Sequence, residues 1–466
     1  MKKTHVIVTG TIIALGALNA QAQTDAEVLK RLDELQKLVE TQNARIAQLE
    51  TQNAKLSQVE AQGAKVAALE KKVDEQSAAV AKATAANPAG ANIAKDGSKT
   101  PTLDLGKGVE KLTLTGYLQP QADHLTADYS GTISGKAGTS DTGEHMFIRR
   151  FVIGGKYDFG QGLNAQLLGN IANNGSSSTT KDQRDFNLER AVMEYTRDGN
   201  VFAFGYDKTP FGLEETTSAS KIRAIERSAA TRYFVEGGSG LSLGSQHTGV
   251  FAKGDLGGGF SYAASIANPE KGENDFSTPD TNTPGFNGRL DYSGKDGDFN
   301  WLVGVDAGYQ SGGLEGAGGS DALGGGVHAQ LGYGRFNLLG EVLAAKVGEG
   351  SLVKAGDDAT PVGFTLQPSF FIVDKKLELV GRWSRVDSDG RGILTSDAIR
   401  RAPGSGYNFD TLDSLYLGLN WYIKGDTFKL MAGYEWARAE DPLKVASGIH
   451  GEETINGFRL RGQVSF

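Results

Sequence analysis

The spacing of hydrophobic residues changes twice along the 466-residue chain. Near the amino terminus, one continuous apolar stretch runs from Val6 to Leu18. From Asp25 to about Lys82, apolar residues recur in steps of three and four, which is the spacing of a coiled-coil seam. From Leu112 onwards, apolar and polar residues alternate with the period of a β-strand. The pattern therefore predicts three zones with different structures.

The first zone has the features of a secretory signal peptide. Lys2 and Lys3 precede the apolar stretch, and Ala20 and Ala22 are small residues at the positions that a signal peptidase reads. The apolar core of about 13 residues is shorter than the roughly 20 that a membrane-spanning helix needs. We therefore predict a signal peptide over residues 1–22 and export of the remaining chain.

The second zone, residues 23–82, is predicted to be an α-helical coiled coil. Its seam residues include Val28, Leu32, Leu35, Val39, Ile46 and Leu49. The polar residues Gln42 and Asn53 fall on seam positions, where they can fix register and strand number. A lone helix would leave this apolar stripe exposed, so an oligomer is the favoured interpretation. Residues 83–111, rich in Ala, Gly, Asn and Thr, are predicted to be a linker.

The third zone, residues 112–466, is predicted to hold about sixteen strands. Alternating runs occur at 112–119, 147–159, 163–171, 188–196, 201–206, 260–266, 286–292, 299–309, 327–343, 364–373, 377–386, 415–423, 428–436 and 458–466. The run 327–343 is long enough for a hairpin that turns at Gly334, and residues 247–253 form a weaker run. In the run 147–159, the odd positions from Phe147 to Phe159 are apolar, with Arg149 as the exception.

These strands are too many for one soluble β-sandwich, which packs its apolar faces around a single dry core. A transmembrane barrel instead turns the apolar face of each strand to lipid and the polar face to a water-filled lumen. Closure of the barrel also leaves no unpaired strand edge in the membrane. All four Trp (301, 383, 421 and 436) fall on the apolar face, as aromatic girdles require. We therefore predict an all-β, antiparallel outer-membrane barrel.

Composition and charge narrow the possible functions. The chain has no Cys, and its six His are scattered, which disfavours a thiolate or zinc centre. The formal net charge of −8 disfavours nucleic acid as a partner. No serine and histidine are paired in a way that indicates a hydrolase. We therefore expect no catalytic residues, metal or other cofactor.

Four segments resemble the phosphate-selective porin O/P family, in the family's order. These segments are Arg149-Arg150 with Gly155, residues 205–218 with 225–228, residues 367–383, and residues 417–422. The resemblance covers about residues 112–466. It implies a sixteen-stranded, trimeric porin in which an inward-folded loop narrows the pore. The helical extension at the amino terminus is less typical of that family.

Strand parity identifies the charges that face the lumen. If the apolar face contacts lipid, the inward cations, our pore-lining candidates, are Arg150, Lys156, Arg190, Arg289, Arg382, Lys429, Arg459 and Arg461. The inward acids are Asp158, Glu194, Asp291, Asp306, Glu378 and Glu435. Guanidinium groups can hold phosphate or carboxylate in two parallel hydrogen bonds, so this set favours anions. Alternatively, the charges pair across strands and only solvate the lumen.

Residues 208–240 form the best candidate for the constriction, because this long polar stretch lies between two strong strands. It contains the cations Lys208, Lys221, Arg223, Arg227 and Arg232 beside the acids Glu214, Glu215, Glu226 and Glu236. We expect Lys221, Arg223 and Arg227 to line the pore together. An ordinary extracellular loop is the alternative. A second charged stretch, Arg391 with Arg400 and Arg401, either folds toward the mouth or forms a solvated loop tip.

Two functions remain. The first is an outer-membrane porin for passive diffusion of small anions, including phosphate, through a homotrimer embedded in outer-membrane lipid. The second is a structural tether, whose periplasmic coiled coil links the barrel to the cell wall or a periplasmic partner.

Overall fold

The computed structural model describes residues 102–104, 111–133, 139–172, 186–236, 241–268, 284–311, 321–354, 356–443 and 450–466. The predicted signal peptide (1–22) and coiled coil (23–82) lie outside these residues, and so does most of the predicted linker (83–111). Among the described residues, no helix is long and apolar enough to cross a membrane.

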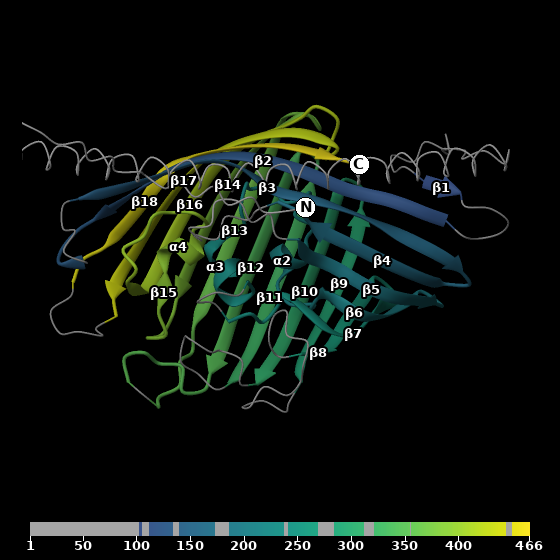
Figure 1. Cartoon of the computed structure of the whole chain (residues 1–466), viewed down its shortest axis with the longest axis horizontal. Coiled ribbons are helices and arrows are strands. Elements are labelled where there is room, and N and C mark those ends of the chain that lie inside the picture. Colours follow the sequence, from purple (N-terminus) through teal and green to yellow (C-terminus); the bar gives the residue numbers. More distant parts are fainter. Residues whose placement is uncertain are drawn as a thin grey trace, which may run out of the picture. The chain divides into compact units, whose positions relative to one another are not determined.

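Sixteen antiparallel strands form a closed barrel (Figure 1). Around the wall they are β2 (Lys111–Tyr129), β3 (Ser140–Gly160), β4 (Leu163–Asn170), β5 (Asn187–Arg197), β6 (Asn200–Lys208), β7 (Gln246–Gly257), β8 (Phe260–Ala267), β9 (Gly285–Asp296), β10 (Phe299–Ser311), β11 (Asp321–Tyr333), β12 (Phe336–Val347), β13 (Val362–Val373), β14 (Leu377–Asp387), β16 (Asn408–Tyr422), β17 (Phe428–Pro442) and β18 (Glu453–Ser465). Each strand pairs with the next, and β18 pairs with β2 to close the ring. The predicted barrel and strand number are confirmed.

Two short strands add to this wall. β1 (Thr102–Asp104) pairs with the first residues of β2, and β15 (Ile393–Leu394) pairs with the start of β16. β11 and β12 form the predicted hairpin, and Gly334 at its turn has a positive φ of 56°. This left-handed conformation costs glycine less than any other residue, which explains the turn.

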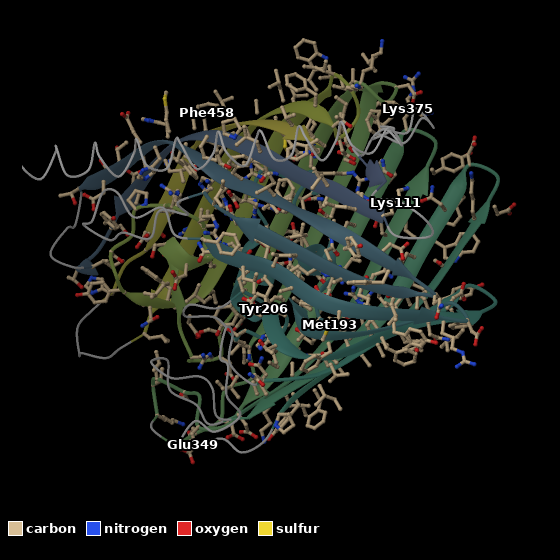
Figure 2. All side chains as sticks on the ribbon, turned by 45° about the vertical axis from the view of Figure 1, so that its right-hand side comes forward. Lys111, Met193, Tyr206, Glu349, Lys375 and Phe458 are labelled. Carbon is tan, nitrogen blue, oxygen red and sulfur yellow. The ribbon has the colours of Figure 1, made fainter. Side chains whose placement is uncertain are left out.

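The two ends of the barrel differ in the length of their connections. Short turns join strands at one end, such as the turn at Lys375 between β13 and β14, and longer loops join them at the other, such as the loop containing Glu349. Lys375 and Glu349 accordingly lie at opposite ends of the barrel in Figure 2. In outer-membrane barrels the short turns face the periplasm and the long loops face outside the cell.

The alternation of the sequence places apolar side chains on the outer face of the wall. In β18, Phe458 lies on the outside (Figure 2) with 62% of its surface exposed, whereas the neighbouring Arg459 is fully buried on the inside. Trp383 and Trp421 are likewise exposed on the outer face. This is the distribution that a barrel needs in lipid, because lipid contacts the apolar side chains that are exposed here.

A β-bulge in β3 corrects one sequence-based prediction. Gln119 pairs with Arg150, and the next residue, Pro120, pairs with Ile148, so Arg149 is an extra residue in β3. A bulge leaves one residue without a partner on the other strand and changes the parity beyond it. Phe147 therefore faces the lumen instead of the predicted lipid side, and the Arg401 guanidinium lies 3.7 Å from the centre of its ring.

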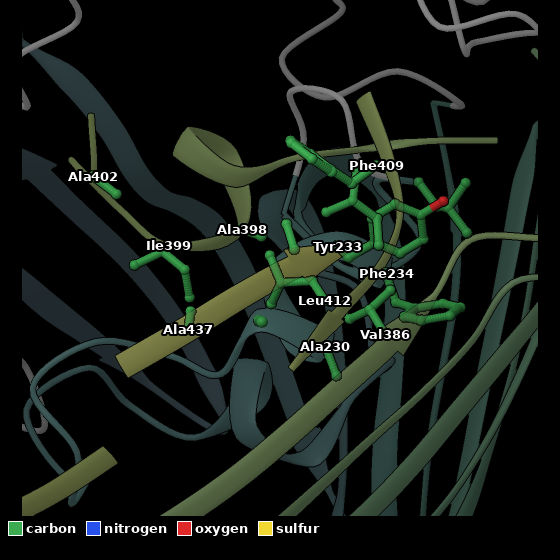
Figure 3. Packing of buried hydrophobic residues seen from close by; sticks show 14 of the residues in the cluster. Ala230, Tyr233, Phe234, Val386, Ala398, Ile399, Ala402, Phe409, Leu412 and Ala437 are labelled. Carbon is green, nitrogen blue, oxygen red and sulfur yellow. The ribbon is translucent and has the colours of Figure 1, made fainter. Parts of the chain in front are cut away.

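Two loops from the long-loop end fold into the barrel. The first inner loop, residues 209–236 and 241–245, contains α2 (Leu213–Thr216) and α3 (Ala229–Phe234). The second inner loop, residues 388–407, contains β15 and α4 (Thr395–Ala398). Buried residues of both loops pack together and against the wall, among them Phe234 of α3, Ala398 of α4 and Phe409 of β16 (Figure 3). The barrel interior therefore holds a small hydrophobic core on one side.

Candidate functional site: the lumen and its inner loops

The first inner loop crosses the lumen and contacts the wall on several sides. Near its start, the backbone N–H of Leu213 donates a hydrogen bond to Glu341 of β12. Further along, the Gln119 side chain of β2 donates to the Ala219 carbonyl over 3.1 Å, and Asn420 of β16 donates to the Arg223 carbonyl over 2.8 Å. The loop is thus held by strands far apart around the ring, which narrows the passage through the barrel.

Glu226, buried in this loop, is the centre of an arginine cluster. Arg149 of the bulge donates to it over 2.8 Å, and Arg461 of β18 donates over 2.6 Å. Arg400 of the second inner loop lies 3.6 Å away. Burial alone would raise the pKa of this carboxyl, but the nearby guanidinium groups, Arg149 first, outweigh it and hold the pKa well below its usual range. Glu226 is therefore ionised in the folded protein.

Glu236, close to α3, is the second carboxylate of this cluster. It contacts Arg232, Arg400 at 3.0 Å and Arg227 at 3.6 Å. Glu226 and Glu236 together thus meet five different arginines among the described residues. Arg227 also contacts Glu215, which in turn contacts Lys208 of β6. With Glu215 and Lys208 included, the cluster has six cations and three carboxylates, an excess of three positive charges.

Most of the other predicted wall cations hold the inner loops in place. Arg382 donates to the Glu226 carbonyl over 2.6 Å, and Lys429 donates to the Ser220 carbonyl over 2.9 Å. Arg459 donates over 2.8 Å to the Arg400 carbonyl. The side chains of Arg382, Lys429, Arg459 and Arg461 all face the lumen, as parity predicts, and all four are buried. Their positive groups contact the protein rather than either of the two cavities described next.

A cavity of about 410 Å³ lies between the inner loops and the wall of β2–β6. Six cationic and four acidic side chains line it. The cations are Arg149, Arg150, Arg190, Lys208, Arg227 and Arg400, and the acids are Glu189, Asp207, Glu215 and Glu236. The cavity therefore has an excess of two positive charges, unlike the chain as a whole.

A second cavity of about 650 Å³ lies nearer the short-turn end, beside β5–β9. Arg190, Asp207, Lys208 and Thr216 line both cavities, so the two meet at these residues. The other charged residues of the second cavity are Glu194, Lys253, Asp255, Arg289 and Asp291. Its lining therefore has four cations and four acids and no net charge. The two cavities follow one side of the lumen, where the inner loops leave space.

The cations along this side differ in how they are compensated. Arg190 lies 2.7 Å from both Glu194 and Asp207, and Arg289 lies 2.6 Å from Asp306. Lys156, half-exposed, lies 3.2 Å from Glu194. The acids Asp291 and Asp306 also hold His328 between them.

Arg150 is the exception among these cations. It donates one hydrogen bond, to the Gln119 side chain over 3.1 Å, and makes no ion pair with any described residue.

The structure places the predicted group of Lys221, Arg223 and Arg227 along two different hollows. Arg227 lines the first cavity, whereas Lys221 and Arg223 line a separate hollow of about 470 Å³ with Lys375 of the short-turn end. Lys221 is exposed, and Arg223 contacts Glu378 at 3.0 Å. Arg232 contacts Glu236 and lines neither cavity.

Sequence reasoning missed three residues of this site. Arg149 was visible as an anomaly, because two adjacent arginines cannot both face the lumen in a regular strand. The parity of Glu341 is uncertain, because it lies beyond the turn at Gly334. Arg400 was visible only as part of a charged stretch, since a loop's path through the lumen has no periodic signal. Within the described ranges, no group of three or more His, Asp and Glu is arranged to hold a metal ion.

A closed barrel with an apolar outside, a charged lumen and a loop folded across it defines the porin class of outer-membrane channels. The family model described as "Phosphate-selective porin O and P" matches residues 121–466, and the chain belongs to this family. It is an outer-membrane porin, a channel and not an enzyme.

Solved structures support the same fold. The anion-selective porin from Comamonas acidovorans matches with 17% identity and a TM-score of 0.52, covering 77% of this chain and 100% of that one. The outer-membrane channel DcaP of Acinetobacter baumannii matches with 13% identity and a TM-score of 0.51, covering 78% and 99%. No curated protein sequence matches the chain.

Proposed function

We propose that this porin passes small anions by passive diffusion along the two cavities beside β2–β9. The observation that carries the proposal is Arg150, a buried cation that lines the first cavity and has no carboxylate partner among the described residues. A buried charge without a partner is costly, so an anion that enters the cavity is stabilised beside it. The excess of two positive charges in the same lining acts in the same direction.

The size of this effect follows from Coulomb's law. A unit charge about 6 Å from the ion path contributes about 0.7 kcal/mol at the dielectric constant of water, and more where the loops exclude water. This charge attracts an anion and repels a cation by the same amount, and salt at about 0.1 M, with a Debye length of about 10 Å, reduces both energies by roughly half. One such charge therefore changes the ratio of anion to cation permeability by roughly threefold, since about 1.4 kcal/mol is tenfold.

Planar-bilayer recording of the refolded protein tests the proposal. In a potassium chloride gradient, we expect stepwise conductance with a reversal potential that favours chloride. Arg150→Gln removes the uncompensated charge and should lower the chloride preference about threefold. Arg385→Gln is the matched control, because Arg385 lies on the outer face of β14, paired with Asp413, and should leave the reversal potential unchanged. A wild-type channel without preference for anions contradicts the proposal.

Phosphate is the anion that we propose as a preferred solute. The family description and the anion selectivity named for the Comamonas porin support this. Adjacent guanidinium groups, such as Arg149 and Arg150, suit the oxygens of a phosphate because each can donate two hydrogen bonds. The test is titration of phosphate into the chloride bath. Phosphate at millimolar concentration should reduce chloride current in the wild type and less so in Arg150→Gln, and equal reduction contradicts this assignment.

We also propose the architecture outside the described residues: a signal peptide over 1–22, a periplasmic coiled coil over 23–82 that assists a homotrimer, and a linker over 83–111. The heptad spacing of Leu32, Leu35, Val39, Ile46 and Leu49 supports an oligomer, and a tether to the cell wall is the second role that this segment fits. Deleting residues 25–82 should lower trimer stability in detergent and release the barrel from cell-wall fractions while conductance remains. Unchanged cross-linking and fractionation would contradict this.

A further inference from the structure

The second inner loop contributes a side chain directly to the first cavity. Arg400 of this loop lines the cavity together with Arg149, Arg150 and Arg227. We propose that Arg400 is a specificity-determining residue of the channel, so that the selective region is built from two loops. This inference rests on the proposed passage of anions through the same cavity.

Packing fixes the second inner loop against the first. Tyr233 and Phe234 of α3 belong to one buried cluster with Ala398, Ile399 and Ala402 of the second loop (Figure 3). Burial of such side chains stabilises their contact in proportion to the apolar area removed from water. The residues on both sides of Arg400 are therefore held in a dry core, and its position in the cavity is defined.

Polar contacts fix the backbone on both sides of Arg400. Arg232 of α3 donates to the Asp397 carbonyl over 2.6 Å, and Arg459 of the wall donates to the carbonyl of Arg400 itself over 2.8 Å. Further along, Ser405 donates to Glu453 of β18 over 2.6 Å. Two elements, α3 and β18, thus hold this segment in one position, as expected of a rigid lining and not of a solvated loop tip.

The charge of Arg400 is not neutralised by its neighbours. Its two carboxylates, Glu226 at 3.6 Å and Glu236 at 3.0 Å, also contact Arg149, Arg461, Arg227 and Arg232. Two carboxylates thus contact five guanidinium groups. About a quarter of the Arg400 side chain is exposed, so its field reaches the water of the cavity. An anion in the cavity therefore experiences Arg400 as a net attraction.

A purely mechanical role for Arg400 makes a different prediction from an electrostatic one. If Arg400 only holds the second loop in place through its ion pair with Glu236, then Arg400→Gln and Glu236→Gln break the same contact. The two variants should then change the chloride preference in the same direction. If its charge selects ions, the two substitutions have opposite effects, because one removes a positive and the other a negative charge from the same lining. The sign of the change separates the two roles.

The experiment measures reversal potentials of refolded full-length protein in planar bilayers at about 0.1 M potassium chloride, where the Debye length is about 10 Å and pore charges are not fully screened. We expect Arg400→Gln to lower the chloride preference about threefold, Glu236→Gln to raise it by a similar factor, and Arg400→Lys to remain close to wild type. Arg385→Gln on the outer wall is again the control.

The outcomes are distinguishable from failure of the proposed function. A wild type without anion preference contradicts the function itself. An anion-selective wild type with an unchanged Arg400→Gln variant contradicts only the role of Arg400, and so do shifts of the same sign in Arg400→Gln and Glu236→Gln. If Arg400→Gln does not refold, Arg400→Lys and Glu236→Gln still decide: a chloride preference that does not rise in Glu236→Gln overturns the inference.

Discussion

Glu226→Gln should affect stability and selectivity in opposite directions. The carboxylate is buried and accepts hydrogen bonds from Arg149 at 2.8 and 3.2 Å and from Arg461 at 2.6 Å. Glutamine has the same shape but only one acceptor oxygen and no charge. The variant therefore leaves at least one buried guanidinium without its acceptor, while the lumen gains one unit of positive charge.

The magnitude can be worked from these contacts. A hydrogen bond to a charged group contributes about 1.5–3 kcal/mol, and removing one partner of a buried ion pair costs about 3–5 kcal/mol. Because glutamine keeps one acceptor, we expect a loss of about 3 kcal/mol in the free energy of unfolding. The chloride preference should rise by up to about threefold, because the variant removes a negative charge beside Arg149 and Arg400, which line the first cavity.

Two assays and one control test this prediction. Urea unfolding of the refolded barrel, followed by tryptophan fluorescence, gives the free energy, and planar-bilayer recording gives the selectivity. Glu144→Gln is the control, because Glu144 forms an exposed pair with His124 and should change stability by less than about 1 kcal/mol. A Glu226→Gln variant as stable as wild type would mean that this cluster does not anchor the loop, and the reasoning would be refuted.

The pH dependence provides an independent check. The pKa of Glu226 is lower in the folded protein than the ordinary value of 4.5, because the arginines outweigh the effect of burial. A depressed folded-state pKa gives stability that is complete above the unfolded pKa and is lost as pH falls through the folded pKa. The difference between wild type and Glu226→Gln should thus be constant from pH 8 to 6 and narrow only below about 4.5. Narrowing between pH 8 and 6 would show that Glu226 is already protonated there.

Two further predictions concern the hydrophobic anchor of the first inner loop. Phe211→Ala removes a fully buried ring and should cost about 3–5 kcal/mol in docking of the loop, measured as larger and noisier single-channel current, whereas an unchanged current would show that Phe211 does not hold the loop. Gly324→Val should displace the loop, because a Cβ there would lie 2.5 Å from Leu243 and 3.0 Å from the Phe211 ring. Gly340→Ala, where the nearest side-chain atom is 3.9 Å away, should leave the current quiet, and equal noise in both glycine variants would contradict the clash.

The barrel could be predicted from the sequence because lipid and water impose one rule on every strand. Each apolar run that the alternation identifies lies inside a strand to within one residue, and the run 327–343 matches the hairpin that turns at Gly334. The rule failed at Phe147, since the bulge at Arg149 depends on where Pro120 of the neighbouring strand falls in the ladder. A prolyl nitrogen cannot donate to a ladder, and bulges are among the places where proline is tolerated. Register between strands is not visible in one strand's own pattern.

The site could be predicted only in part, for a related reason. Strand parity predicts that Arg150, Arg382 and Arg459 face the lumen, as they do in the structure. Parity alone does not predict which of these side chains lines a cavity. That depends on the path of the first inner loop, and Phe211 and Phe234, two apolar residues in a polar stretch, set this path by packing on one side of the barrel. Arg382 and Arg459 therefore contact the inner loops, whereas Arg150 lines the first cavity.

The net charge of the chain and the charge of its pore have opposite signs, and the structure explains why. The whole chain has a formal charge of −8, yet the first cavity has six cations and four acids. Exposed acids such as Asp357 are surrounded by water and salt, which screen them beyond about 10 Å at 0.1 M ionic strength. Cavity charges act across a few ångströms of confined water. The selection that we propose therefore rests on a few arginines whose carboxylates are shared or absent, of which Arg150 is the clearest.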